Sequence, residues 1–156
     1  MRFLGRLKPG LIRVTPPWQS FAETVTGLVD TLAQERQLPP GCAAAAVQAV
    51  TAREVGSSTA LLDIRAGVPH ARLPGLARPV VAIATSSSGL YEAVPTVPIQ
   101  IVILVLSPPD DVTNHLETLA GIATLLRSAE FRSALLRARD GDEALAVVKR
   151  HARVTP

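Results

Sequence analysis

Residues 20–38 carry the clearest hydrophobic pattern of the chain, and this pattern has the period of an α-helix. Ser20, followed three residues later by Glu23, forms a capping box, which is typical of a helix start. Apolar side chains then recur on one helical face until the two prolines at 39–40; they are Phe21, Val25, Leu28, Val29 and Leu32. The pattern therefore predicts an amphipathic helix that begins at Phe21 and is stopped by the prolines.

A second helix is predicted over residues 43–54. This segment begins with four alanines, the residue with the highest helix propensity, and Val47 and Val50 supply its apolar contacts. It ends at Arg53 and Glu54.

The pattern changes to short β-rich runs after the second helix. Residues 60–64 and 80–85 are typical of strands, and turn sequences bound them. Residues 99–106 are almost entirely aliphatic, which indicates a central strand covered on both faces. The alternating segment 11–14 predicts an edge strand near the start of the chain.

Helical spacing returns after residue 108 and predicts three more helices. Their apolar faces are formed by Leu116, Leu119, Ile122, Ala123 and Leu126, then by Phe131, Leu135 and Leu136, and last by Leu145 and Val148. Asp140 and Glu143 cap the last helix. Because the strands are grouped between helices with few βαβ units, the sequence predicts an α+β fold, a three-layer α/β/α sandwich.

The composition is consistent with one domain over residues 1–156, with a core at about 20–150 and a basic Pro/Gly-rich segment at 1–19. The chain has a single cysteine, Cys42, so an internal disulfide is excluded and a reducing compartment is favoured. The longest aliphatic run, residues 101–106, is far shorter than the ~20 residues of a membrane-spanning helix. We therefore expect a cytoplasmic protein that is not embedded in a membrane.

The formal net charge of +3 comes from 16 Lys and Arg against 13 Asp and Glu, and the basic residues gather near both ends. Nucleic-acid binding would also call for aromatic side chains that stack on bases, and the chain has one Trp, one Tyr and three Phe. We therefore expect no nucleic-acid partner.

Most catalytic motifs are absent, which leaves the histidines as candidates. His70 follows Pro69, whose fixed φ makes the backbone that enters the histidine stiff. A neutral imidazole has one nitrogen with a free lone pair and can attack a phosphoryl group without a separate base. Such a site needs donors and cations for the phosphoryl oxygens. His70 is therefore a candidate nucleophile, and the alternative is an ordinary loop histidine.

Two further groups are suited to binding those oxygens. His115 lies near a helix start that Thr113 or Asn114 can cap, where the helix dipole attracts anions. Arg53 offers a guanidinium fork, and the hydroxyls of residues 57–59 can donate hydrogen bonds. A capping histidine, a solvated arginine and an ordinary turn are the structural alternatives, and only the fold can bring these segments together.

Several segments resemble one known family in the same order along the chain. They are Arg53-Glu54, Ser58-Thr59, Gly67-Val-Pro-His70-Ala-Arg72, the strands 80–85 and 97–106, and Asn114-His-Leu-Glu-Thr-Leu-Ala120. This sequence resembles the IIA component of the bacterial sugar phosphotransferase system, of the fructose/mannitol and nitrogen-regulatory type. The resemblance runs from about Ser20 to Lys149 and implies a mixed sheet between helical layers, similar to phosphotransferase/anion-transport proteins.

The resemblance also implies a function and its site. His70 would accept a phosphoryl group from an HPr-type carrier or its nitrogen-branch relative and pass it to a IIB protein or domain. Arg53, Thr59 and His115 would surround the phosphate, without a metal or organic cofactor. The alternative is a regulatory module whose phosphorylation state controls a partner protein without sugar transport. Two departures, the altered stretch 60–65 and Gly67 in place of alanine, bear on the placement of Thr59 more than on that of His70.

Overall fold

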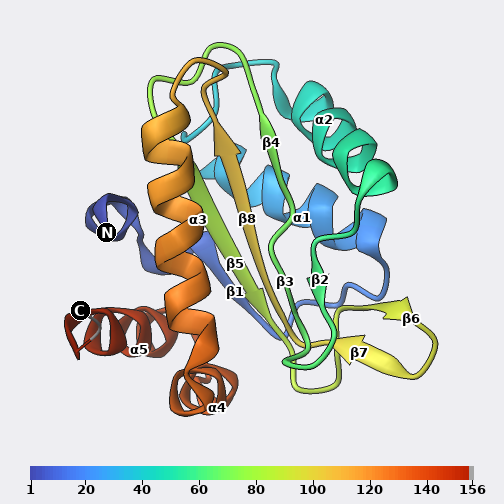
Figure 1. The fold of residues 1–156 in the computed structure, drawn as a ribbon, viewed down its shortest axis with the longest axis vertical. Coiled ribbons are helices and arrows are strands. Elements are labelled where there is room, and N and C mark those ends of the chain that lie inside the picture. Colours follow the sequence, from blue (N-terminus) through green and yellow to red (C-terminus); the bar gives the residue numbers. More distant parts are fainter. Residues whose placement is uncertain (155–156) are drawn as a thin grey trace.

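The computed structural model describes residues 1–154, and it confirms a three-layer α/β/α sandwich (Figure 1). The helices α1 (Phe21–Gln34) and α2 (Ala43–Gly56) pack against one another; α1 also packs against the strand β5 (Val80–Thr85) and α2 against the strand β4 (His70–Arg72). On the other side of the sheet, α3 (Val112–Arg127) crosses in front of the strands. Two short 3₁₀-helices, Arg2–Arg6 and Pro9–Leu11, precede the first strand and were not expected from the sequence.

The sheet is mixed, in agreement with the resemblance. Its six strands are β1 (Ile12–Val14), β2 (Ala60–Leu61), β3 (Ala66–Gly67), β4 (His70–Arg72), β5 (Val80–Thr85) and β8 (Ile101–Ser107). The spatial order is β1-β5-β8-β3-β2, and β4 pairs with β8 on the same side as β3. Strand β8 is antiparallel to β5 and parallel to β3 and β4.

The aliphatic segment predicted to be central is β8, and every one of its seven residues is buried. All six residues of β5 are buried as well, and these two strands form the middle of the core. The strand β1 lies at the edge of the sheet beside β5, as its short alternating pattern predicts.

The C-terminal part of the chain forms α3, α4 (Ala129–Arg137) and α5 (Gly141–Val154). Glu143 donates its backbone N–H to the carboxylate of Asp140, which confirms the predicted cap of the last helix. The predicted cap of α3 was wrong. The cap is Asp111, two or three residues earlier than Thr113 or Asn114, because the side chain of Asp111 accepts the backbone N–H of Asn114.

Two element boundaries also differ from the prediction, each because of a local turn. The helix α1 ends at Gln34, before the prolines, because Arg36 adopts a left-handed conformation and Gln37 donates back to the carbonyl of Leu32. The expected strand 60–64 is limited to β2, and a turn that ends at Arg65, with φ of 54°, leads into β3. No helix within residues 1–154 has the length and apolar character needed to cross a bilayer.

A hairpin that the sequence analysis did not predict extends from the sheet (Figure 1); it pairs β6 (Tyr91–Val94) with β7 (Val97–Ile99). The expected strand 97–106 is therefore two strands, β7 and β8, separated at Gln100. Tyr91 in this hairpin is buried, and its ring packs edge-on against Phe21 with 5.2 Å between centroids. Its hydroxyl has no hydrogen-bond partner among the described residues. A Cβ at Gly67 would lie 2.6 Å from this hydroxyl oxygen, so the hydroxyl occupies the space of an alanine methyl.

We expect Gly67→Ala to destabilise the protein by about 1–3 kcal/mol, because the added methyl must displace the Tyr91 hydroxyl from a packed site. The same substitution in a Tyr91→Phe background should cost clearly less, since that background lacks the oxygen. Urea denaturation of the four proteins measures the coupling. Gly56→Ala serves as a control, because a Cβ there meets nothing within 4 Å. If Gly67→Ala lowered the free energy of unfolding equally in both backgrounds, the Tyr91 hydroxyl would not be the reason that position 67 is glycine.

Candidate functional site

The structure brings His70 and His115 together although they are 45 positions apart in the sequence. His70 is the first residue of β4, and His115 lies in the first turn of α3. Their ring centroids are 5.6 Å apart, and the ring planes are inclined by 55°. His70 is partly exposed, whereas His115 is 6% exposed. A partner molecule can therefore reach the imidazole of His70, whereas the imidazole of His115 is enclosed by the protein.

A break in a strand positions His70. The strands β3 and β4 both pair with β8 in one continuous register, since Gly67 lies opposite Val102 and His70 opposite Val105. Pro69 interrupts the ladder between them because it has no N–H to donate, although its carbonyl still accepts the N–H of Val105. The interruption leaves His70 at the first position where pairing resumes, on a backbone held from both sides.

The backbone also fixes the tautomer of His70. The ring Nδ1 lies 2.8 Å from the carbonyl oxygen of Val68. A carbonyl oxygen can only accept, so Nδ1 carries the proton and donates it. In a neutral ring, Nε2 then has its lone pair free. His70 is therefore set up to react through Nε2.

His115 is held by the strand beneath it. Its Nδ1 lies 2.7 Å from the Oγ of Ser107, the last residue of β8. Burial, followed by the positive charges of Arg72, His70 and Arg53, lowers the pKa of His115 from 6.5 to about 4. His115 is consequently neutral at physiological pH, with one nitrogen that donates and one that accepts.

Arg72 is a site residue to which the sequence analysis assigned no role. It donates from Nη1 to the carbonyl oxygen of Pro108, at 3.0 Å, and lies 3.5 Å from that of Asp111. It thereby ties β4 to the loop that leads into α3, the helix that contains His115. Side chains two residues apart in a strand point to the same face, so the position of Arg72 after His70 was the signal that could have found it.

The other predicted groups lie beside the pair with different partners. Arg53, in the last turn of α2, is exposed and donates a hydrogen bond to the carbonyl of Ser57. Its positive charge also contributes to the lowered pKa of His115. The Thr59 hydroxyl donates to Glu54 at 2.7 Å rather than pointing to a free anion site. Its backbone carbonyl accepts the N–H of Val68, so Thr59 supports the segment that holds His70.

This arrangement suits transfer of an anionic group to a ring nitrogen. It offers an accessible lone pair on His70, a neutral imidazole beside it, and two guanidinium groups whose charges act on the same place. Within residues 1–154, no cluster of three or more His, Cys, Asp or Glu could hold a metal ion. The expected absence of a metal or organic cofactor stays a prediction.

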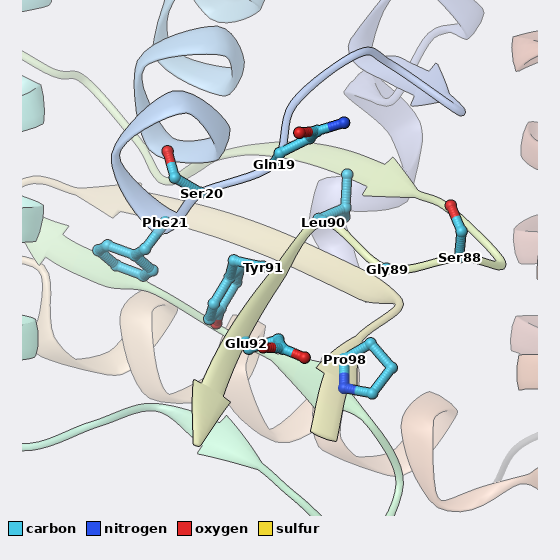
Figure 2. A pocket seen from close by; sticks show the side chains of 9 residues that line it. All are labelled: Gln19, Ser20, Phe21, Ser88, Gly89, Leu90, Tyr91, Glu92 and Pro98. Carbon is cyan, nitrogen blue, oxygen red and sulfur yellow. The ribbon is translucent and has the colours of Figure 1, made fainter. Parts of the chain in front are cut away.

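An open cleft of about 600 Å³ lies elsewhere, between the start of α1 and the β6–β7 hairpin (Figure 2). Phe21 and Tyr91 form one wall, and Gln19 and Ser88 lie toward the other side. None of the residues that line it belongs to the histidine pair. The candidate chemistry at His70 therefore lies outside this cleft.

A protein-family model described as "Phosphoenolpyruvate-dependent sugar phosphotransferase system, EIIA 2" matches residues 6–151. The chain belongs to this family. Membership confirms the resemblance seen in the sequence and makes the chain a component of that phosphotransferase system.

Individual relatives agree with the family assignment. The EIIA chain is 30% identical over 95 residues to the PTS system fructose-specific EIIA component of Haloferax volcanii, and the match covers 60% of this chain and 61% of that protein. The chain thus spans about three fifths of the length of the curated relative it matches.

Solved structures share the fold of the EIIA chain. The nitrogen regulatory protein IIA-Ntr of Neisseria meningitidis is similar with a TM-score of 0.79 and 20% identity, over 95% of this chain and 99% of that one. A complex of enzyme IIAMtl and phosphorylated enzyme IIBMtl from Escherichia coli matches with a TM-score of 0.73 and 17% identity, over 92% and 97%. At these identities the likeness concerns the fold alone.

Proposed function

We propose that this EIIA chain is a phosphocarrier that accepts a phosphoryl group on Nε2 of His70 from an HPr-type carrier and passes it to a IIB protein or domain. Family membership supports the general role. The observation that carries the site assignment is the hydrogen bond from His70 Nδ1 to the carbonyl of Val68, because it leaves Nε2 bare on the exposed ring. We place this relay in the cytoplasm.

The transfer conserves atoms and electrons. The Nε2 lone pair of His70 attacks phosphorus while the bond from phosphorus to the donor's ring nitrogen breaks, and that electron pair returns to the donor's imidazole. Arg53 and Arg72 provide positive charge for the phosphoryl oxygens, and neutral His115 provides a donor beside them. In the second step the acceptor on IIB attacks the same phosphorus, and the electron pair returns to His70.

The IIB partner is proposed from the fold likeness to IIAMtl, whose solved complex contains phosphorylated IIBMtl. The HPr-type donor follows from the sequence resemblance. Thr59 enters the proposal through its backbone, which holds Val68, since its hydroxyl is already bonded to Glu54. The residues proposed for the site are His70, His115, Arg53 and Thr59, together with Arg72, which the structure adds.

Incubation of the full chain with phosphoenolpyruvate, enzyme I and HPr is expected to label it with phosphate. The label should be lost in acid and kept in base, as a phosphorus–nitrogen bond requires. Omission of HPr is the control and should prevent labelling. A chain that takes no label, or an acid-stable label, would contradict the phosphocarrier role.

Addition of a IIB protein then separates the two candidate functions. A carrier in sugar uptake should lose its label to IIB, whereas a regulatory switch should keep it. The regulatory alternative thus remains a defined outcome of the same experiment.

A further inference from the structure

Within residues 1–154, Ser107 is the one side chain that forms a hydrogen bond with His115, and it does so at Nδ1. It ends β8 with its side chain in the core, at 0% exposure, and its backbone carbonyl accepts the N–H of Leu73. Its hydroxyl oxygen lies 2.7 Å from His115 Nδ1 and has no other hydrogen-bond partner among residues 1–154. The direction of this single hydrogen bond decides which nitrogen of His115 carries the proton.

Hydrogen-bond accounting selects one direction. If Nδ1 carried the proton, it would donate to the hydroxyl oxygen, and the hydroxyl hydrogen of Ser107 would be left in the core without an acceptor. If Nδ1 is bare, the hydroxyl donates to it and both groups are satisfied. Leaving a buried donor unsatisfied is unfavourable enough to shift the populations by about tenfold or more. The hydroxyl therefore donates, and the proton of the neutral ring lies on Nε2.

We propose that Ser107 is a positioning residue that fixes His115 as the Nε2–H tautomer, so that His115 donates a hydrogen bond to the phosphoryl group carried by His70. Nδ1 of His115 faces Ser107 in the core, which leaves Nε2 as the nitrogen available to the site. The proposal rests on the proposed function for its phosphoryl group. The hydrogen bond itself can be measured without any phosphate.

The two rings then complement each other. His70 donates from Nδ1 to a backbone carbonyl and presents a bare Nε2, while His115 accepts at Nδ1 from Ser107 and presents a protonated Nε2. The opposite tautomer of His115 would direct a lone pair at the negatively charged oxygens and oppose transfer. A donor that is fixed before the phosphoryl group arrives needs no reorganisation during the reaction.

The tautomer can be read directly by ¹⁵N NMR of the full, unphosphorylated chain at pH 7, because protonated and bare ring nitrogens differ widely in chemical shift. We expect His115 to show a bare Nδ1 and a protonated Nε2, and the Ser107 hydroxyl proton to exchange slowly with water. A proton on Nδ1 of His115 would overturn the proposal.

The kinetic test compares Ser107→Ala with Ser86→Ala. Ser86 is also buried, at 4% exposure, but it bonds to Ser88 and follows β5 at the opposite end of the sheet from Ser107. With saturating phospho-HPr, we expect Ser107→Ala to slow labelling about tenfold, since the His115 donor is no longer fixed. The KM for the carrier should not change, because buried Ser107 touches no partner, and Ser86→Ala should match wild type.

A wild-type saturating rate in Ser107→Ala, or an equal loss in Ser86→Ala, would overturn the positioning role. Failure of the wild-type chain to take any label would instead refute the proposed function. In that case the NMR measurement still decides whether Ser107 sets the tautomer of His115.

Discussion

Replacement of His70 by alanine is expected to abolish phosphoryl labelling, with a loss of at least about a thousandfold, because the substitution removes the ring nitrogen that we propose as the nucleophile. The neighbouring imidazole cannot take its place. His115 is buried, and its Nδ1 is bonded to Ser107. The measurement is transfer of radiolabelled phosphate from phosphoenolpyruvate through enzyme I and HPr.

The matched control is His151→Ala, which removes a histidine from α5 instead. His151 packs against Phe131, with ring centroids 5.5 Å apart, and lies outside the pair at the site. This variant should be labelled like wild type. Circular dichroism should show that both variants fold, since His70 is partly exposed and fills no core volume. Label that persists in His70→Ala at the wild-type level would remove His70 from the mechanism.

The second large effect is on stability in mild acid. The pKa of His115 is about 4 in the folded protein, whereas its ordinary value is 6.5. Between these two pH values His115 is mostly protonated in the unfolded chain and mostly neutral in the folded protein. The contribution of neutral His115 is complete above pH 6.5 and decreases as the pH falls toward 4. Its full size is at most about 3 kcal/mol, the limit without solvent screening.

Urea denaturation at a series of pH values, for wild type and for His115→Gln, measures this contribution. The variant keeps a polar side chain but cannot take up the proton, so its free energy of unfolding should change less between pH 6.5 and 4. The lowered pKa values of Asp111 and Glu143 act in both proteins and cancel in the difference. Parallel pH profiles for the two proteins would contradict the pKa assigned to His115.

The sequence predicted most of the fold because the hydrophobic pattern and the fold agree where elements are long or fully buried. The helix after Ser20, the strand β5 and the central strand β8 all follow from residues that share one environment. The β6–β7 hairpin was missed because its exposed residues carry little apolar alternation. The start of α3 was misplaced because Asp111, Thr113 and Asn114 are all good caps, and only the fold selects one.

The site was predicted only as far as residue types allow. A proline before a histidine indicates a stiff approach, and the family resemblance added His115 and Arg53. The directions of the hydrogen bonds at Val68 and Ser107 could not be foreseen, because they depend on register between distant strands. Arg72 received no role for a related reason, since its partner is a carbonyl in a loop 36 positions away.

The strand β8 sets the separation of the two imidazoles, because His70 is registered on Val105 and Ser107 leads through one short loop to α3. A single inserted residue between Val105 and Asp111 would shift one ring relative to the other. The turn between β2 and β3 lies outside this stretch: Arg65 at its end accepts the N–H groups of Gln100 and Ile101, but residues 62–64 do not pair with β8. Engineered tags or loops inserted at residues 62–64 should therefore leave the spacing of the two histidines unchanged, because they do not alter the register of β4 on β8.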